Sequence, residues 1–252
     1  MEPVRSTRNP RVIEAIRLHR ARRRAETGDT LLEGLHLLEE ALRAGAPIKT
    51  VFVCEGDEVG FDLVDKLESV VVTDVVMKRL AGTQNPRGPV GIMTIPPDEQ
   101  DDHRSLMVSW GVGDPGNVGT LIRSAAAFGL AFLSGPGTAD PWSPKVLRAA
   151  AGSHFRTAIE RRAVLSVGML QARGFTVVAS VVEGGDPPDC LAGPGRFALV
   201  VGEEGSGLPI GVVREADLMV TIPMPGHTES LNVAVAGSLL AYELASRRTQ
   251  TT

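Results

Sequence analysis

From Ser105 onward, short apolar segments alternate with segments of helical periodicity, and this alternation is the strongest constraint on the fold. The apolar segments are five to eight residues long and read SLMVSW, LAFLS, FTVVASVV, FALVVG and DLMVTIPM. Strands that are apolar along their whole length need cover on both faces, which is typical of a mostly parallel sheet between two layers of helices. We therefore predict an α/β fold with a mostly parallel sheet and helices on both faces.

The chain before Ser105 has a different texture. Residues 6–45 have the pattern of two helices around a turn, and short strands are predicted at Lys49–Cys54 and Val70–Thr73. A turn cluster, TQNPRGPVGIM, leads into a further strand, and the Pro-rich acidic run PPDEQDD follows it. We place a boundary in this acidic run and predict a small α/β domain at residues 1–98 and a second domain at residues 103–252.

In parallel α/β sheets, ligands bind beyond the carboxyl ends of the strands, so the loops that follow strands are the first candidates for a site. The first such loop, residues 111–129, has the G-x-G-x-x-G spacing of dinucleotide-binding turns. We discount a dinucleotide site because Asp114 would lie where a pyrophosphate must approach and Pro115 removes a backbone donor. The loop offers Asn117 at the helix entrance and Arg123 about two turns later. The alternative is that Arg123 is an ordinary surface residue.

The second loop, residues 199–209, reads LVVGEEGSGLP. Gly205 and Gly207 allow the backbone to approach a ligand closely and to present N–H groups to it. Glu203 and Glu204 would repel a phosphate, so the loop favours a ligand that carries positive charge or that is bound through neutral backbone groups. The alternative is an ordinary Gly-rich turn.

The third loop lies in residues 222–242, IPMPGHTESLNVAVAGSLLAY, which have the pattern of a strand end, a turn, a polar corner and a long apolar helix. Thr228 or Glu229 is predicted to cap the helix, which places Ser230 and Asn232 in its first turn. Helical spacing predicts a core-facing stripe made of Leu231, Val235, Leu239 and Tyr242. The alternative is a well-capped corner that binds nothing.

Basic charge is concentrated at the start of the chain. Residues 1–24 hold eight arginines and two glutamates, although the net charge of the chain is −4. Such a segment suits a polyanion, and the alternative is a solvated basic helix face. No signal peptide or membrane span is indicated, and Cys54 and Cys190 are too few for a zinc cluster and are expected to be small buried residues. We expect a cytoplasmic protein without a membrane or metal partner, and assign no chemistry to His154 or His227.

Three motifs in these loops, in this order, resemble those of one family. They are N-x-G-x-x-x-R at residues 117–123, GEEGSGL at residues 202–208 and IPM…ESLNVAVA at residues 222–236. They resemble the motifs of the SpoU/TrmH family, which are S-adenosylmethionine-dependent RNA ribose 2′-O-methyltransferases of the SPOUT superfamily. EGLHLLEEAL, followed by TQNPRGPVGIM, is similar to the RNA-binding domain that precedes many of these catalytic domains. The resemblance covers nearly the whole chain and implies a C-terminal trefoil knot and a homodimer.

The resemblance implies that S-adenosylmethionine is bound in the knot by Gly202, Ile222, Met224, Ser230 and Leu231. It implies catalytic roles for Arg123 together with Asn117, Glu204, Ser230 and Asn232, in a site completed across the dimer interface. Because an arginine side chain stays protonated at neutral pH, we expect Arg123 to stabilise the ribose alkoxide rather than to accept a proton. The second motif often has Asn where this chain has Glu203, so that side chain's role is in doubt.

RNA contacts are predicted for basic residues in both domains: Arg20, Arg22, Arg23, Arg24 and Arg87 in the first, and Lys145 and Arg148 in the second. Ribosomal RNA is the expected substrate because of the N-terminal domain. The alternatives are methylation of transfer RNA, methylation of a base instead of a ribose, and a non-catalytic RNA-binding assembly factor with the same fold.

Overall fold

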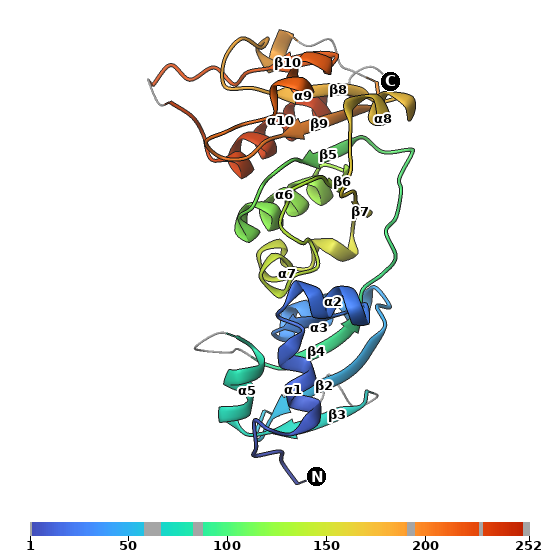
Figure 1. Cartoon of the computed structure of the whole chain (residues 1–252), viewed down its shortest axis with the longest axis vertical. Helices are drawn as coiled ribbons and strands as arrows, with labels where there is room; N and C mark the ends of the chain where they lie inside the picture. The colour runs from blue at the N-terminus through green and yellow to red at the C-terminus, as the bar shows by residue number, and fades with distance from the viewer. Residues whose placement is uncertain (1, 58–66, 83–87, 191–194, 227–228, 249–252) are drawn as a thin grey trace. The chain divides into compact units, whose positions relative to one another are not determined.

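Two sheets organise the chain, one in each of two compact units (Figure 1). The computed structural model describes residues 2–57, 67–82, 88–190, 195–226 and 229–248. One unit runs to Pro97 and also includes Trp142–Phe155, a segment from the middle of the chain. The other comprises Asp98–Pro141 and the chain from Arg156 onward. The functional domains expected at residues 1–98 and 103–252 stay a prediction.

The first unit is built on a four-stranded sheet with the order β1-β4-β2-β3. Strand β4 is antiparallel to both β1 and β2, and β2 is parallel to β3. Its elements are α1 (Pro10–Arg17), α2 (Ala21–Thr27), β1 (Asp29–Glu33), α3 (Leu35–Arg43), β2 (Ile48–Cys54), β3 (Ser69–Val72), α5 (Asp74–Leu80), β4 (Val90–Thr94), α7 (Pro144–Ala150) and the 3₁₀ turn η1 (Ser153–Phe155). Helix α1 starts where the Asn9 side chain accepts a hydrogen bond from the Arg11 N–H, and α2 ends at Gly28, whose φ is 69°.

Helix α7 packs on β1 within this first unit. The Thr30 hydroxyl donates to the Trp142 carbonyl at 2.6 Å, and Arg148 forms an ion pair with the buried Glu33 carboxylate. Burial raises the pKa of Glu33, and the nearby positive charge of Arg148 opposes this rise. Arg148 is therefore part of the packing of α7 against β1.

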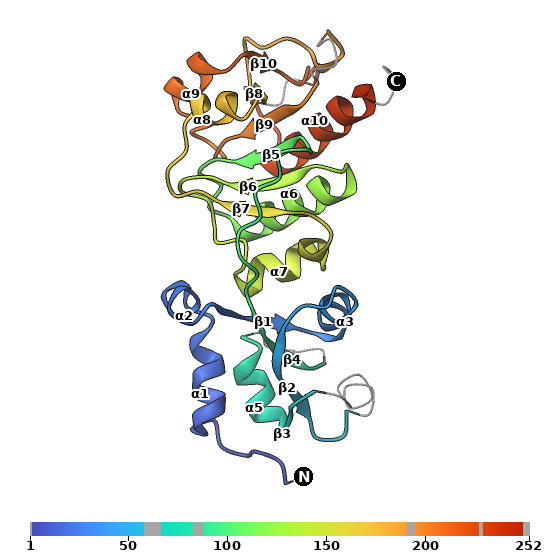
Figure 2. The ribbon, with the colours of Figure 1, turned by 90° about the vertical axis from the view of Figure 1, so that its right-hand side faces the viewer.

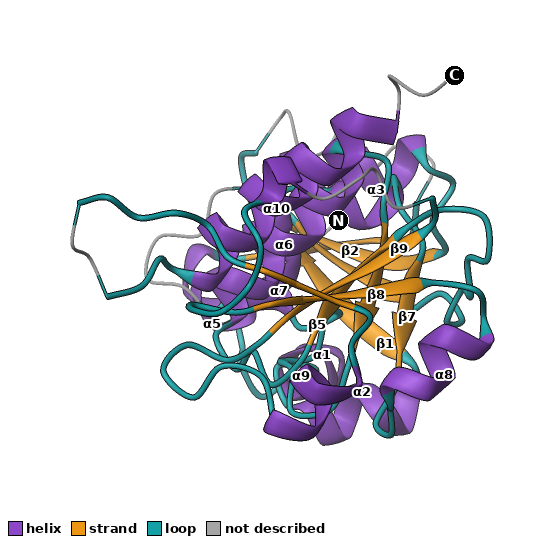
Figure 3. Cartoon of the chain, turned by 90° about the horizontal axis from the view of Figure 1, so that it is seen from above, coloured by secondary structure: helices purple, strands orange, loops and turns teal. Residues whose placement is uncertain are grey.

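The second unit contains the predicted sheet: six strands in the order β10-β8-β9-β5-β6-β7, with every pair parallel. Its elements are β5 (Leu106–Ser109), α6 (Pro115–Ala127), β6 (Ala131–Ser134), β7 (Ile159–Arg161), α8 (Val167–Ala172), β8 (Thr176–Ser180), η2 (Pro188–Cys190), β9 (Phe197–Val201), α9 (Ile210–Glu215), β10 (Leu218–Val220) and α10 (Val233–Arg248). Helices α8 and α9 cover one face of the sheet, and α6 and α10 cover the other (Figures 2 and 3). The predicted α/β class is confirmed.

Helix α10 buries a different face from the one predicted. Val235, Leu239 and Tyr242 are 48%, 50% and 57% exposed, whereas the buried side is formed by Val233, Ala234, Leu240, Ala241 and Leu244. Gly237 explains the choice of face, because a Cβ added there would lie 2.6 Å from the Leu121 Cδ2 atom on α6. This glycine lets α10 approach α6 and β9 closely. The helix is apolar on more than one side, so periodicity alone could not select the buried side.

Some expectations concern residues outside the described part of the chain. The connection from β10 to α10 includes residues 227–228, so the expected knot stays a prediction. Cys54 is half-buried against the core of the first unit, and the side chain of Cys190 is not described. Among the described residues, no helix has both the length and the apolar character that crossing a membrane requires.

The acidic run that we expected to separate two domains is held by arginines of the second unit. Asp98 pairs with Arg161 at 2.6 Å, and Asp102 pairs with Arg173 at 3.1 Å. Asp101 accepts hydrogen bonds from the backbone N–H groups of His103 and Arg104, both at 2.8 Å. The boundary was placed here because of the run's composition, and its aspartates attach it to the second unit.

Asp101→Asn is expected to lower the free energy of unfolding by about 1–2 kcal/mol at pH 7. Burial raises the pKa of Asp101, but the hydrogen bonds from Arg104 and His103 and the charge of Arg104 outweigh it and hold the pKa at about 2, below the ordinary 3.8. A lowered pKa stabilises the folded state above the ordinary value, and this contribution is lost as the pH falls from about 4 to about 2. Urea unfolding should show the difference at pH 7 and its decline in acid. Equal stabilities at pH 7 would contradict this role.

Candidate active site

Three side chains, one from each of the loops that follow β5, β9 and β10, are hydrogen-bonded to one another. The Glu204 Oε1 atom accepts hydrogen bonds from the Asn117 Nδ2 group at 3.0 Å and from the Asn232 Nδ2 group at 2.5 Å. It also accepts from the Val233 backbone N–H at 3.3 Å, and Asn232 Nδ2 donates to Asn117 Oδ1 at 3.0 Å. We call Asn117, Glu204 and Asn232 the polar cluster. Its members are 28 to 115 residues apart in the chain.

Helix caps place two members of the polar cluster. Asp114 is the N-cap of α6 and accepts from the Asn117 N–H at 2.9 Å, with Pro115 in the first turn. The Asn232 Oδ1 atom accepts from the N–H groups of Ala234 and Val235 at 2.9 and 3.2 Å. Helix α10 therefore begins after Asn232, so the prediction that Ser230 and Asn232 lie in its first turn, with Thr228 or Glu229 as the cap, is wrong. Thr228 itself lies outside the described residues. Asn232 uses its carbonyl oxygen as the cap and its amide to bind Glu204.

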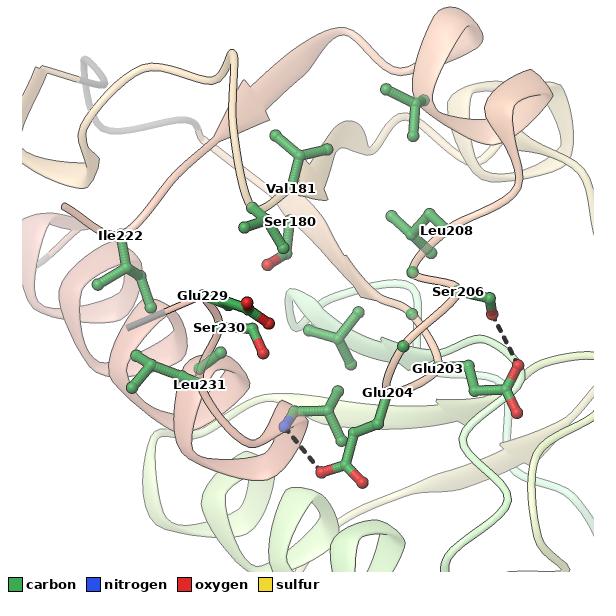
Figure 4. A pocket seen from close by; sticks show the side chains of 18 of the residues that line it. Ser180, Val181, Glu203, Glu204, Ser206, Leu208, Ile222, Glu229, Ser230 and Leu231 are labelled. Atoms are coloured by element: carbon green, nitrogen blue, oxygen red, sulfur yellow. Dashed lines mark hydrogen bonds between the residues drawn. The ribbon is translucent and has the colours of Figure 1, made fainter. Parts of the chain in front are cut away.

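A cavity of about 540 Å³ lies beside the polar cluster (Figure 4). The five residues that the sequence assigns to cofactor binding all line it: Gly202, Ile222, Met224, Ser230 and Leu231. The end of β8 also lines it through Ser180, Val181 and Val182, which the sequence analysis missed. Strand β8 lies between β9 and β10, and this sheet order, which the sequence does not reveal, is what brings the fourth loop to the cavity.

The loop after β9 folds tightly because of its glycines. A Cβ added to Gly202 would lie 2.4 Å from the Gly207 carbonyl carbon, which no side chain can accommodate. Gly205 and Gly207 have φ values of 95° and 67°, in the left-handed region that glycine adopts easily. The Gly207 N–H closes the turn by donating to the Glu203 carbonyl at 2.9 Å. The cavity wall at this point is therefore backbone.

The charged residues that line the cavity, among those described, are all acidic. Three of its lining residues, Glu203, Glu204 and Glu229, are carboxylates, and none of its described lining residues is basic. Most of the other lining side chains are apolar. Such a cavity suits a ligand with an apolar body and a positive charge, and it disfavours a phosphate.

Arg123 lies on the same helix as Asn117 but outside the polar cluster. It is exposed, and six residues at about 100° each place it on a different side of α6 from Asn117. Within the described part of the chain, no hydrogen bond or ion pair connects Arg123 to the polar cluster or to the cavity. The structure thus brings together every predicted catalytic and cofactor residue except Arg123.

The arginines predicted to bind RNA differ in what they can offer to a phosphate. Arg20 and Arg22 are exposed, although Arg22 also pairs with Glu26 at 2.8 Å. Arg23 donates to Glu14 at 2.6 Å. Arg24 is 4% exposed, and its guanidinium donates to the carbonyls of Leu18 and His19. Arg24 is thus a structural residue that ties together α1 and α2.

The remaining predicted RNA contacts lie elsewhere. Lys145 is exposed on α7, whereas the neighbouring Arg148 pairs with Glu33. Arg87 lies outside the described residues. His154, to which we assigned no chemistry, is buried with its ring centroid 5.1 Å from that of Trp142, and His227 is not described.

Comparison with protein families gives two matches that together span most of the chain. Residues 105–242 match the SpoU rRNA Methylase family. Residues 9–91 match the MRM3-like substrate binding domain. The second match ends before the acidic run, and the first begins after it.

Individual relatives match over nearly their whole length. The chain is 35% identical to the 23S rRNA (guanosine(2553)-2′-O)-methyltransferase RlmP of Bacillus subtilis, over 97% of this chain and 99% of the relative. A crystal structure of an AdoMet-bound rRNA methyltransferase from Sinorhizobium meliloti has a TM-score of 0.83 and 28% identity, and 97% of each chain is covered. A crystal structure described as an RNA 2′-O ribose methyltransferase has a TM-score of 0.84 and 29% identity, over 98% of this chain and 100% of the other.

Proposed function

The chain belongs to the SpoU rRNA methylase family, and from this premise we propose that it methylates ribosomal RNA of the large subunit. The enzyme class follows from the family: it is an S-adenosylmethionine-dependent methyltransferase that acts on a ribose 2′-hydroxyl of RNA. The large-subunit substrate is supported by the full-length similarity to RlmP, a 23S rRNA enzyme. The match to a substrate-binding domain at residues 9–91 supports RNA binding by the first domain.

The observation that carries this proposal is the polar cluster beside the cavity, formed by one residue from each of the three motifs. The cavity fits S-adenosylmethionine, because its apolar walls suit an adenosine and its carboxylates suit a cation. The bound cofactor supplies a methyl group attached to a sulfonium. When the methyl group is transferred, the sulfur leaves as a neutral thioether, and this leaving group requires neither an acid nor a metal. Gly202, Ile222, Met224, Ser230 and Leu231 are the residues that we propose hold it.

The chemical difficulty lies with the nucleophile, since a ribose hydroxyl is hardly ionised at neutral pH. Positioning and charge stabilisation must therefore supply most of the acceleration. We assign stabilisation of the developing alkoxide to the guanidinium of Arg123, which also binds the adjacent phosphate. Asn117, Glu204, Ser230 and Asn232 hold the cofactor loops in the reactive geometry. For three of these residues, the hydrogen bonds of the polar cluster support this role.

Incubation of the protein with methyl-labelled S-adenosylmethionine and unmodified bacterial RNA tests the proposed function. Alkaline hydrolysis cleaves next to a free 2′-hydroxyl but not next to a methylated one, so ribose methylation gives a labelled, hydrolysis-resistant dinucleotide. A labelled mononucleotide would indicate base methylation, and absence of label would favour a non-catalytic factor. Separating the RNA by size before hydrolysis distinguishes ribosomal from transfer RNA. Label in transfer RNA alone would overturn the choice of substrate.

We propose a homodimer, and the exposed side of α10 supports it. Val235, Leu239 and Tyr242 form an apolar stripe, and the Tyr242 ring lies 5.7 Å from that of Phe128 at the end of α6. Arg123 lies on α6 away from the polar cluster of its own chain. A partner that covers this surface could receive Arg123 into its own site.

Leu239→Glu is expected to convert the dimer to a monomer and to abolish methylation. Each interface would then bury two unpaired carboxylates, which should weaken association by at least about 100-fold. Sedimentation velocity measures the oligomeric state. Val164→Glu is the matched control, because Val164 is 78% exposed on another part of the unit and its change should leave the state unaltered. A wild-type monomer in solution would contradict the proposal.

The double substitution Arg20→Gln/Arg22→Gln is expected to weaken RNA binding by about tenfold. The slope of log affinity against log salt concentration should fall by the amount that corresponds to about one to two lost phosphate contacts. Both residues are exposed at the start of α2. Filter binding of ribosomal RNA over a range of salt concentrations gives both quantities. The matched control is Arg214→Gln, which removes an exposed arginine from α9. An unchanged salt slope would show that these arginines form only a solvated helix face.

A further inference from the structure

One carboxylate in the cavity has no partner among the residues that the structure describes. In Figure 4, the side chain of Glu229 points into the cavity between Ser180 and Ser230. Within the described part of the chain, Glu229 makes neither a hydrogen bond nor an ion pair, and the residue is exposed. A carboxylate on an apolar wall without a partner is available to a ligand.

The other two carboxylates of the cavity are already engaged. Glu204 accepts three hydrogen bonds on its Oε1 atom within the polar cluster. Glu203 accepts a hydrogen bond from the Ser206 hydroxyl at 2.7 Å, and its side chain points away from the cavity (Figure 4). Since none of the described lining residues is basic, Glu229 is the charged group that a ligand in the cavity meets without competition from a protein cation.

The position of Glu229 relates it to the reacting end of the cofactor. It lies three residues before Asn232, a member of the polar cluster, and next to Ser230. The methyl group must lie near the residues that position the ribose hydroxyl, so the sulfonium that carries it belongs at this end of the cavity. The positive charge of the sulfonium is lost when the methyl group leaves. A carboxylate at this place therefore interacts with the reactant and the product to different extents.

We propose that Glu229 makes the cavity select the sulfonium form of the cofactor over its neutral thioether product, S-adenosylhomocysteine. This inference rests on the proposed function. Both ligands carry the same adenosine and the same amino-acid end, so contacts with those parts cannot distinguish them. A single carboxylate that faces a cation in a partly exposed site changes the affinity for that cation by about three- to tenfold. The consequence for turnover is weaker inhibition by the product.

Calorimetry of wild type and Glu229→Gln with four ligands tests this selection. S-adenosylmethionine and sinefungin carry a positive charge at or next to the sulfonium position, S-adenosylhomocysteine carries only the amino-acid ammonium, and methylthioadenosine carries neither. We expect Glu229→Gln to weaken the first two by about three- to tenfold and to leave the last two within about twofold. If binding of S-adenosylhomocysteine were weakened equally, Glu229 would interact with the amino-acid ammonium instead of the sulfonium, and the proposal would be overturned. Weakening of all four would indicate a hydrogen bond to the adenosine and overturn it as well.

Controls separate a local contact from a general change. Glu183→Gln removes an exposed carboxylate that follows the cavity residue Val182 but does not line the cavity, and it should leave the affinity ratio unchanged. Glu229→Asp, which keeps the charge, should retain most of the selection. Product inhibition in turnover should increase in Glu229→Gln, with the ratio of the product's inhibition constant to the cofactor KM falling by the same factor.

Failure of this inference and failure of the proposed function give different results. A wild-type protein that methylates ribosomal RNA but shows an unchanged ligand ratio in Glu229→Gln would overturn the selection by Glu229 alone. A wild-type protein that binds no S-adenosylmethionine, with or without ribosomal RNA, would overturn the proposed function itself.

Discussion

Replacing Arg123 with alanine is expected to reduce ribose methylation by at least about 100-fold and to leave the affinity for S-adenosylmethionine unchanged. The reason is that Arg123 does not line the cavity, whereas the alkoxide that forms in the transition state requires a fixed positive charge. Initial rates with labelled cofactor and calorimetry on the same preparation give the two quantities. A normal rate in Arg123→Ala would remove this residue from the mechanism.

Two comparisons make the Arg123 result specific. Arg123→Lys keeps the charge but loses the planar fork that binds a phosphate at two points, so we expect it to recover part of the rate. Arg214→Ala removes an exposed arginine from α9 and should leave methylation intact. If Arg214→Ala were as impaired as Arg123→Ala, loss of surface charge would explain both.

Mixing experiments can show whether Arg123 acts in its own chain or in the partner. If it acts in the partner, equal amounts of inactive Arg123→Ala and Glu204→Ala chains should recover about a quarter of wild-type activity, because half of the dimers are mixed and each has one intact site. If it acts in its own chain, every site lacks one residue and the mixture stays inactive. Subunit exchange must be confirmed by mass analysis of tagged chains.

Removing the Glu204 carboxylate should have an effect of similar size, with Glu204→Ala slowing methylation by about 100-fold. Its Oε1 atom accepts three hydrogen bonds, so its loss leaves the amides of Asn117 and Asn232 without their shared acceptor. The loop after β9 and the start of α10 would then no longer be tied together. Cofactor affinity should fall as well, which distinguishes this variant from Arg123→Ala.

The neighbouring residue Glu203 provides the matched control for Glu204. Its carboxylate is bound to Ser206 and points away from the cavity, so Glu203→Gln should change the rate by less than about threefold. Glu204→Ala combined with Asn232→Ala should be little worse than either single change, because the two side chains act as one unit. Additive losses would show that Glu204 and Asn232 act independently.

The sequence was most informative where local pattern and chemistry coincide. Apolar strands separated by helices predicted the parallel sheet, and the three motif loops contained the members of the polar cluster before any contact was known. Strand order was not readable, because parallel strands are joined by long connections that do not reveal which strands become neighbours. For this reason the contribution of β8, through Ser180 and Val181, was missed.

Other features depended on contacts between distant residues. Arg24 and Arg148 carry the charge expected of an RNA-binding surface. However, Arg24 is buried and donates to the carbonyls of Leu18 and His19, and Arg148 pairs with Glu33. An arginine's charge is visible in the sequence, but its partner depends on which elements pack beside it. The same holds for Asp98 and Asp102, which bind arginines of the second unit in the acidic run where the domain boundary was predicted.

By itself, the sequence determined the α/β class, the family motifs and the chemical nature of the site, because side-chain type and periodicity are properties of neighbouring residues along the chain. Only the tertiary structure decided that Gly237 turns α10 so that Val235, Leu239 and Tyr242 face outward. It also decided that Asn232 both caps α10 and binds Glu204. Both outcomes follow from close packing. The local sequence is compatible with several arrangements of these residues, and packing against distant parts of the chain selects one of them.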